Sequence, residues 1–212
     1  MKLMIDYLKK PLLITITLLV LCGVAYPLLM TGISLIVFPH QANGSLIEVD
    51  GKVIGSELIG QEFTADYFMK CRPSAIGYNT YTEEDVKNGT YSSVGSGSQN
   101  LAASNPKLIE RVEKDIENFL DENPTVKRED IPTDLLTASG SGLDPHISPE
   151  AAEIQLERIS AASKIGMERL QEIVRNNTTK KAFGFFGEDT VNVLKVNLEI
   201  AKEMGFIESI QY

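Results

Sequence analysis

Hydrophobic positions are distributed very unevenly along this chain. Residues 11–38 carry no formal charge, whereas Lys9 and Lys10 stand directly before this run and the next ionised side chain is Glu48. Because an α-helix rises about 1.5 Å per residue, roughly 20 apolar residues cross a hydrocarbon core of about 30 Å. The pattern therefore predicts a tail at residues 1–10, one transmembrane helix at 11–38 and a soluble domain at 39–212.

A cleaved signal peptide is the alternative interpretation of this apolar run, with Gly23-Val24-Ala25 as the small-residue cleavage site. The core of a signal peptide is only about 7–15 residues long and is followed by polar chain. Here apolar residues continue to Phe38. We therefore expect an uncleaved anchor, in which Pro27 kinks the helix or ends its deep section near Tyr26.

Small residues inside the anchor favour packing against other membrane helices. Gly23, Ala25 and Gly32 allow a second helix to approach closely, and we count Pro27 with them as a packing position. The lysines of the N-terminal tail set the orientation, because cytoplasmic flanks carry the excess of Lys and Arg. We expect a cytoplasmic N-terminus and an extracytoplasmic C-terminal domain.

After the anchor, the pattern changes to that of an α+β domain with a small sheet and three or four helices. Two short β-branched runs around Asp50-Gly51, within residues 46–59, predict a hairpin. A polar loop rich in Gly, Ser and Asn extends from 76 to 104 and includes Ser92 and Ser93. A loop of this length within a domain is usually functional or disordered.

Capping signals place the helices of this domain. Asn105-Pro106 begins one that Asn123-Pro124 ends, and Ser148-Pro149 begins a second that runs to about Ser163. A third is expected at residues 167–176. Residues 130–136 fit a helix or a strand, and residues 183–187 a buried strand or tight turn. The last segment, through residue 204, begins as either strand or helix.

Charge excludes several classes of function. The formal net charge is −9, and the first ten residues contribute +2, which leaves −11 for the remainder. Nucleic-acid binding requires clustered Lys and Arg, so we expect no nucleic-acid partner. The same acidity disfavours flat adhesion to an anionic membrane surface. The two cysteines exclude a disulfide framework.

Sequence motifs of common enzymes are missing. The chain has no Walker A sequence, no His-Glu-x-x-His and no Gly-x-Ser-x-Gly, and its two histidines are too few for a catalytic zinc site. We therefore expect no metal and no cofactor of its own. The remaining enzymatic alternative is a hydrolase that uses Ser139 or Ser141 with Asp144 and His146.

A glycine-rich contact loop is the other interpretation of this segment. Gly140 and Gly142 would let backbone groups approach a partner closely. A ligand-binding module whose pocket includes residues 78–91 is a third alternative.

The motifs together resemble the C subunit (KdpC) of the Kdp-type bacterial potassium-transporting P-type ATPase. The most specific stretch is Thr-Ala-Ser-Gly-Ser-Gly-Leu-Asp-Pro-His-Ile-Ser-Pro-Glu-Ala-Ala at residues 137–152. Further similar stretches are residues 26–29, 38–46, 54–61, 72–75, 104–106 and 183–194. One departure is the insertion within Tyr78 to Ala103, where the family usually has a shorter Gly-Gly-Ser-Asn turn.

The resemblance implies an accessory, non-catalytic subunit in the inner membrane of a bacterium. Its implied partners are a pore-forming potassium-binding subunit and the P-type ATPase subunit. The family is described as assisting ATP binding by the catalytic subunit, which would make residues 139–146 part of a shared ATP site. An external domain cannot touch cytoplasmic ATP, so we expect these residues to form a docking loop over the outer mouth of the pore subunit.

Overall fold

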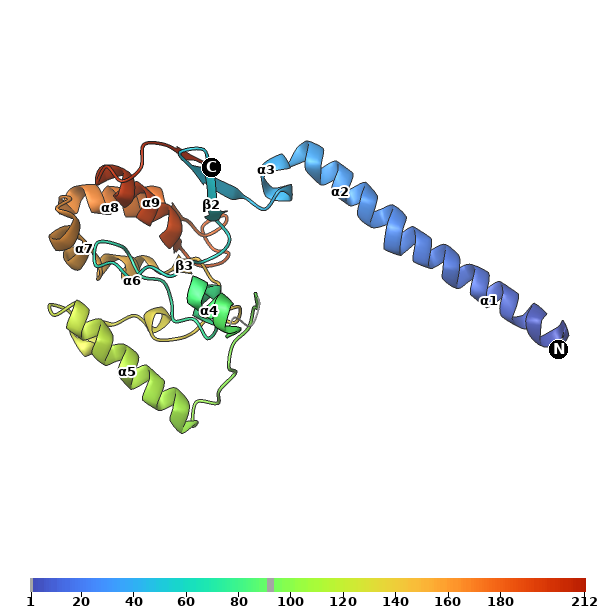
Figure 1. Cartoon of the computed structure of the whole chain (residues 1–212), viewed down its shortest axis with the longest axis horizontal. Coiled ribbons are helices and arrows are strands. Elements are labelled where there is room, and N and C mark those ends of the chain that lie inside the picture. Colours follow the sequence, from blue (N-terminus) through green and yellow to red (C-terminus); the bar gives the residue numbers. More distant parts are fainter. Residues whose placement is uncertain (1, 91–93) are drawn as a thin grey trace. The chain divides into compact units, whose positions relative to one another are not determined.

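The computed structural model describes residues 2–90 and 94–212 (Figure 1). The chain divides into two units, residues 1–46 and 47–212. The first unit is helical, whereas the second combines helices with two three-stranded sheets. The predicted α+β class is therefore confirmed.

The first unit begins with a long helix made of α1 (Lys2–Val20), a π-helical turn (Leu21–Ala25) and α2 (Tyr26–Val37), followed by the short α3 (Pro39–Ala42). Residues 2–10 of the predicted tail are thus helical and continuous with the anchor. The apolar stretch Tyr7–Val37 has 31 residues, and its most hydropathic window is not buried within the protein. At about 1.5 Å per residue it exceeds the roughly 30 Å of a hydrocarbon core.

The π-helical turn ends at Ala25, two residues before Pro27. The Tyr26 N–H donates to the Leu21 carbonyl, five residues earlier, instead of to the fourth. A proline ring crowds the carbonyl four residues before it, here that of Gly23, and a wider turn relieves this contact. The helix therefore continues through Pro27 to Val37.

The second unit opens with the predicted hairpin. Strands β1 (Leu46–Val49) and β2 (Lys52–Ser56) flank Asp50 and Gly51, whose φ angles of 49° and 76° are those of a type I′ turn. Strand β6 (Ile210–Gln211) pairs antiparallel with β1, giving the order β2-β1-β6. The Asp50 carboxylate accepts a hydrogen bond from the Ser209 N–H at 2.9 Å, and hydrogen bonds from Ser209 lower its pKa.

The other sheet has the order β3-β5-β4 and is antiparallel throughout. Its strands are β3 (His146–Ile147), β4 (Thr178–Thr179) and β5 (Thr190–Asn192). In the central strand β5, Asn192 pairs with His146 of β3, and Thr190 pairs with Thr179 of β4. This sheet ties the predicted contact loop, which precedes β3, to the C-terminal part of the unit.

The capping signals locate most helix starts correctly. Asn105 caps α5 (Pro106–Glu122), and α8 covers Met167–Asn176 as predicted. The helix expected from Ser148 to Ser163 is divided into α6 (Pro149–Glu153) and α7 (Leu156–Ser163). The last segment is strand and then helix, because Asn192 ends β5 and caps α9 (Val193–Glu203).

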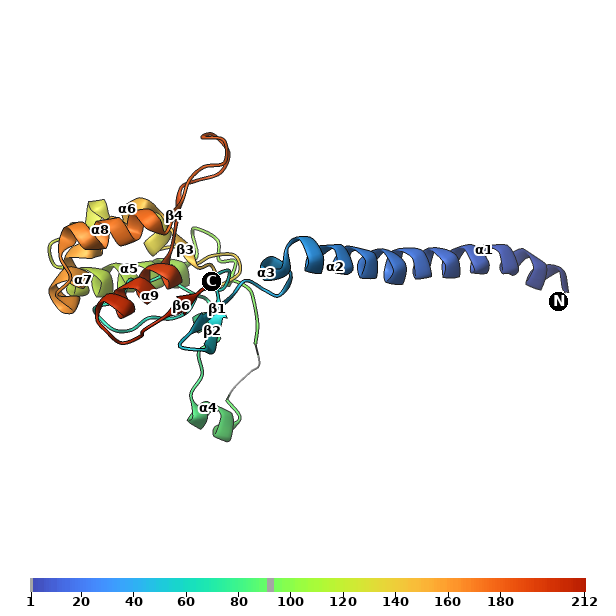
Figure 2. The same cartoon turned by 90° about the horizontal axis from the view of Figure 1, so that it is seen from above.

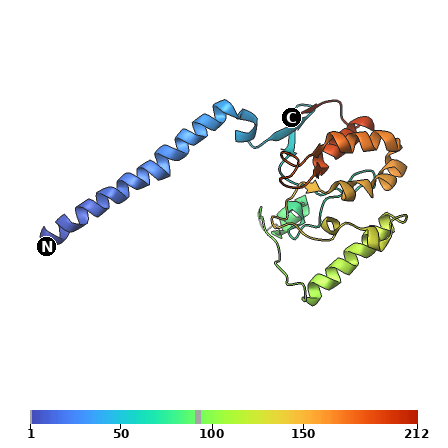
Figure 3. The same ribbon diagram turned by 180° about the vertical axis from the view of Figure 1, so that it is seen from behind.

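Figures 1 and 3 show α5 along one edge of the second unit and the α8–α9 pair along the opposite edge. Helix α8 packs against α7 and α9. Helix α9 is buried on two sides: its Val196 and Ile200 belong to the main core with α5 to α8, and its Leu194 and Leu198 to a second cluster with β1.

Two buried amide side chains fix the irregular segment around Met69. Asn197 accepts from the Met69 N–H at 2.7 Å and donates to the Met69 carbonyl at 2.8 Å. Gln155 accepts from the Lys70 N–H at 2.8 Å and donates to the Lys70 carbonyl at 3.2 Å. Gln155 lies where the helix predicted from Ser148 divides, so the break places an amide against the neighbouring backbone.

Short helical turns interrupt the remaining irregular connections. The predicted long loop contains a 3₁₀ turn (Gly77–Asn79) and α4 (Glu83–Asn88), which Thr82 and Asp85 close with a capping box. Ser92 and Ser93 lie outside the described residues. The segment expected as helix or strand at 130–136 forms 3₁₀ turns at Arg128–Asp130 and Thr133–Leu135.

The phenylalanine-rich segment between β4 and β5 forms a tight turn, and its prediction as a buried strand is wrong. Ala182 and Phe186 pair in an isolated antiparallel bridge. Phe183, Phe185 and Phe186 are all exposed.

Candidate functional site

The predicted contact loop, residues 139–146, is a junction at which three distant segments meet. Its carbonyls at positions 141, 142 and 143 accept hydrogen bonds from the Gly97 N–H (2.8 Å), the Ser74 hydroxyl (2.7 Å) and the Gly60 N–H (2.8 Å). We call residues 139–146, together with Gly60, Ser74 and Gly97, the loop junction. Because each partner comes from a different part of the chain, the junction fixes their mutual arrangement.

The two serines of the loop stabilise its backbone. The Ser139 hydroxyl oxygen accepts from the Gly142 N–H at 2.9 Å, and that of Ser141 accepts from the Leu143 N–H at 3.1 Å. Ser139 is buried, with 6% of its surface exposed. Such side-chain bonds to nearby N–H groups are the usual local role of serine in turns.

Asp144 receives three polar contacts. Its Oδ2 lies 3.0 Å from Arg72 Nη1, and its Oδ1 accepts from the His146 N–H at 3.0 Å and lies 3.5 Å from His146 Nδ1. The His146 imidazole, the His146 N–H and the Arg72 guanidinium hold the pKa of Asp144 below its ordinary value, against the opposing effect of burial. A distance of 3.5 Å is long for a hydrogen bond, so the N–H and the guanidinium are the closer contacts of the carboxylate.

This geometry does not assemble a catalytic triad. Within residues 2–90 and 94–212, no hydrogen bond joins Ser139 or Ser141 to His146, whose imidazole instead faces Asp144. A nucleophile needs its base within hydrogen-bond reach. In the described part of the chain, no cluster of three or more His, Cys, Asp or Glu side chains could hold a metal ion.

The glycines of the junction differ sharply in their surroundings. A Cβ on Gly142 would lie 2.7 Å from Ile76 Cγ1 and 2.9 Å from the Gly97 carbonyl oxygen, and the φ angle of +69° disfavours any side chain. A Cβ on Gly60 would lie 2.7 Å from the Asp144 carbonyl oxygen. Gly140 has nothing within 4 Å of its Cβ position and is exposed. Gly142 is thus a packing residue, whereas Gly140 faces open space.

Tyr78 and Cys71, which are partly buried, lie next to Arg72 and the junction residue Ser74. The Tyr78 hydroxyl donates to the Arg72 carbonyl at 2.7 Å, and the Tyr78 N–H donates to the Ser74 hydroxyl at 3.0 Å. Burial raises the pKa of Cys71 to about 12 and also raises the pKa of Tyr78. The sequence analysis included Arg72 and Ser74 only in residues 72–75, a stretch similar to the family, because their bonds to distant residues carry no local signal.

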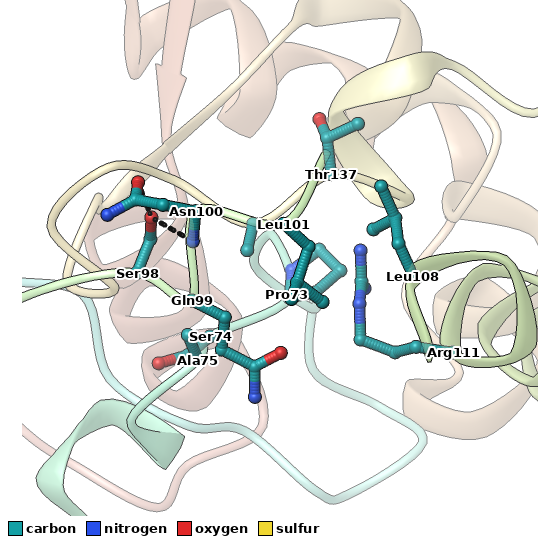
Figure 4. Close-up of a pocket in the computed structure, with 11 residues that line it drawn as sticks. Pro73, Ser74, Ala75, Ser98, Gln99, Asn100, Leu101, Leu108, Arg111 and Thr137 are labelled. Atoms are coloured by element: carbon teal, nitrogen blue, oxygen red, sulfur yellow. Dashed lines mark hydrogen bonds between the residues drawn. The ribbon is translucent and has the colours of Figure 1, made fainter. Parts of the chain in front are cut away.

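A cavity of about 310 Å³ adjoins the junction (Figure 4). Ser74 belongs to both the cavity lining and the junction, Thr137 and Ala138 directly precede the junction in the chain, and Arg111 also lines the cavity. The Arg111 guanidinium also contacts Asp115 and the Leu136 carbonyl. The remaining lining residues are Pro73, Ala75, Ser98, Gln99, Asn100, Leu101 and Leu108.

The insertion between Tyr78 and Ala103 reaches both the cavity and the junction. Residues 98–101 line the cavity, while the Ser96 hydroxyl donates to the Ser141 carbonyl at 3.2 Å. Asn79 closes the insertion by pairing with both backbone groups of Gly95 at 3.0 Å. The pocket expected to include residues 78–91 stays a prediction: Tyr78 lines a separate cavity with Cys71 and Ser74, and residue 91 lies outside the described residues.

The predicted packing positions of the anchor lie on the apolar helix of the first unit. Gly23 and Ala25 belong to the π-helical turn, and Pro27 and Gly32 to α2. Nothing lies within 4 Å of a Cβ built on Gly23 or Gly32. These positions leave the helix surface open to a neighbouring helix.

Comparison with known families decides the relationship of the chain. The family described as "KdpC: K+-transporting ATPase, c chain" matches residues 8–202. The chain belongs to the KdpC family. This match extends from the apolar helix through the loop junction to α9, so both units belong to the shared family sequence.

Individual KdpC relatives are similar to this chain over nearly their whole length. The protein named "Potassium-transporting ATPase KdpC subunit" from Clostridium kluyveri is 62% identical over 198 residues, covering 93% of this chain and 94% of the relative. The protein of that name from Clostridioides difficile is 60% identical, covering 94% and 99%. That from Caldanaerobacter subterraneus is 45% identical, covering 94% and 96%.

Proposed function

We propose that this chain is the accessory, non-catalytic subunit of a potassium-transporting P-type ATPase complex. Membership of the KdpC family carries the proposal, since the relatives are named as subunits of a potassium-transporting ATPase. The partners are the pore-forming potassium-binding subunit and the ATP-hydrolysing subunit, in a bacterial inner membrane. The chain has no cofactor of its own in this proposal.

The arrangement of the loop junction supports docking rather than chemistry. The Ser139 and Ser141 hydroxyl oxygens accept hydrogen bonds from backbone N–H groups, and Asp144 forms an ion pair with Arg72. Gly140 remains exposed between the two serines. A rigid loop with an open glycine can approach a partner backbone closely.

The proposed orientation has the lysine-rich N-terminus in the cytoplasm and the second unit outside. Lys2, Lys9 and Lys10 support it through the positive-inside rule. In this orientation the chain assists the ATP-hydrolysing subunit by stabilising the complex. The alternative, in which residues 139–146 help to bind ATP, requires the second unit in the cytoplasm.

Affinity purification of the tagged full chain from detergent-solubilised membranes tests the docking role. The wild-type chain should bring two larger subunits with it, and Gly140→Val should lose them. Gly166→Val is the matched control, because Gly166 is exposed like Gly140, also has nothing within 4 Å of its Cβ, and lies outside the junction. Retention of the partners by Gly140→Val would remove the junction as the docking site, and a wild-type chain purified alone would remove the complex.

Protease treatment of intact spheroplasts tests the orientation separately. We expect cleavage of the second unit without disruption of the membrane. Protection until the bilayer is opened would favour the alternative with a shared ATP site.

A further inference from the structure

The turn between β4 and β5 displays three phenylalanine rings to solvent. Phe183 is 88% exposed, Phe185 69% and Phe186 61%. Figure 2 shows this segment extending away from the body of the second unit. Three large apolar side chains at one projecting tip form a local apolar surface that water solvates poorly.

The backbone holds this display in place. Phe183 and Gly184 have φ angles of 54° and 81°, and the Phe185 N–H donates to the Ala182 carbonyl at 3.3 Å. These are features of a type I′ turn, whose first central position usually holds Asn, Asp or Gly. A bulky residue with positive φ is an outlier, and such outliers occur mainly where function requires them.

The tip contains no polar side chain, since residues 182–187 are Ala, Phe, Gly, Phe, Phe and Gly. Its backbone N–H groups are largely satisfied internally. The Ala182 N–H donates to the Phe186 carbonyl at 2.8 Å, and the Phe186 N–H donates to the Ala182 carbonyl at 3.0 Å. The Gly184 N–H donates to the Lys181 carbonyl at 3.0 Å. A segment with satisfied backbone groups enters a hydrocarbon environment without leaving those donors unpaired.

Opposite charges are paired at the base of the turn. Lys180 Nζ lies 2.9 Å from Asp189, and Lys181 Nζ lies 3.5 Å from Glu188. The base therefore has no net charge, in contrast to the acidic surface of the remainder. Its ionic groups can stay at the level of lipid headgroups while the rings enter the apolar layer.

We propose that residues 182–187 insert into the surface of the bilayer that the apolar helix of this same chain spans. A protein partner would be expected to meet polar groups that confer specificity, and this tip offers none. The anchor keeps the second unit near a bilayer. Shallow insertion of three rings is therefore enough to hold the turn at the bilayer surface. Acidic repulsion does not oppose this contact, because the inserted segment is neutral and its base is charge-balanced.

Tryptophan fluorescence of the full chain tests the insertion directly, because the natural sequence contains no tryptophan. Phe185→Trp provides a single reporter, and Phe183→Trp provides a second if the first variant fails to fold. Phe206→Trp is the matched control, since Phe206 is 56% exposed and lies outside the turn. Each variant is reconstituted alone in phosphatidylcholine vesicles with or without brominated acyl chains.

We expect the turn reporters to show blue-shifted emission, loss of most intensity in brominated vesicles and protection from aqueous iodide. The control should be quenched by iodide and not by bromine. Turn reporters quenched by iodide as strongly as the control would overturn the proposal. A blue shift without bromine quenching would indicate contact with protein, including a second copy, and would also overturn it. Because no other subunit is present, the outcome is independent of the proposed complex.

Discussion

Substitutions at Gly142 and Gly140 distinguish the folding of the loop junction from its docking, because Gly142 is closely packed and Gly140 faces open space. An alanine Cβ at Gly142 would meet Ile76 and the Gly97 carbonyl at less than 3 Å, with φ at +69°. The left-handed backbone costs about 1–2 kcal/mol for a residue with a Cβ. Overpacking against surroundings that must shift adds about 1–3 kcal/mol.

We therefore expect Gly142→Ala to lower the free energy of unfolding of the second unit by about 2–5 kcal/mol. For a domain of this size, each kcal/mol corresponds to about 2–4 °C in melting temperature. Gly140→Ala introduces no contact within 4 Å at a position without positive φ. Its effect should lie between zero and about 1 kcal/mol of stabilisation, through the unfolded chain.

Thermal unfolding of the full-length protein in detergent, followed by circular dichroism, measures the difference. The anchor helix contributes a constant signal, so the transition of the second unit is compared between variants. Equal melting temperatures for the two variants would refute the assignment of Gly142 as a packing residue. A destabilised Gly140→Ala would show that the exposed glycine is also structural.

Three further predictions concern individual side chains. The pKa of Asp144 in the folded protein lies below its ordinary 3.8, so its contribution to stability is present above pH 3.8 and is lost as the pH falls through the folded pKa. The free energy of unfolding, measured with urea, should therefore depend less on acid pH in Asp144→Asn than in the wild type. Asn197→Ala leaves both buried backbone groups of Met69 unpaired and should lower the free energy of unfolding by about 2–4 kcal/mol, measured by urea denaturation; an unchanged midpoint would contradict this. In a Cys22→Ser background, the remaining thiol of Cys71, whose burial raises its pKa to about 12, should react with iodoacetamide at pH 8 much more slowly before unfolding than after it.

Local signals in the sequence were sufficient for the elements that begin or turn at a single residue. Asp50-Gly51 predicted the hairpin, and Asn105 and Ser148 predicted helix starts, because turn and capping chemistry depends only on adjacent residues. The break at Gln155 was missed because its amide bonds to Lys70, 85 residues away. No periodicity along the chain encodes such a pairing.

The candidate site was predicted as a segment but not as a junction. Composition identified residues 139–146 as a contact loop, yet the partners Gly60, Ser74 and Gly97 are separated from it by dozens of residues. The phenylalanines at 183–187 were expected to be buried or in a turn because apolar residues usually enter the core. Their exposure follows from the turn conformation, which sequence hydrophobicity does not report.

The pairing of β6 with β1 has a consequence for the order of folding. Val49 and Ile210 are neighbours in one sheet although some 160 residues separate them in the chain. A ribosome adds roughly 5–20 residues per second, so the first strand waits for many seconds before its neighbour exists. During that interval β1 has an unsatisfied edge, and a chaperone that covers nascent strands would have its clearest target here. Removal of Ile210 and Gln211 should leave this edge permanently open and the product prone to aggregation.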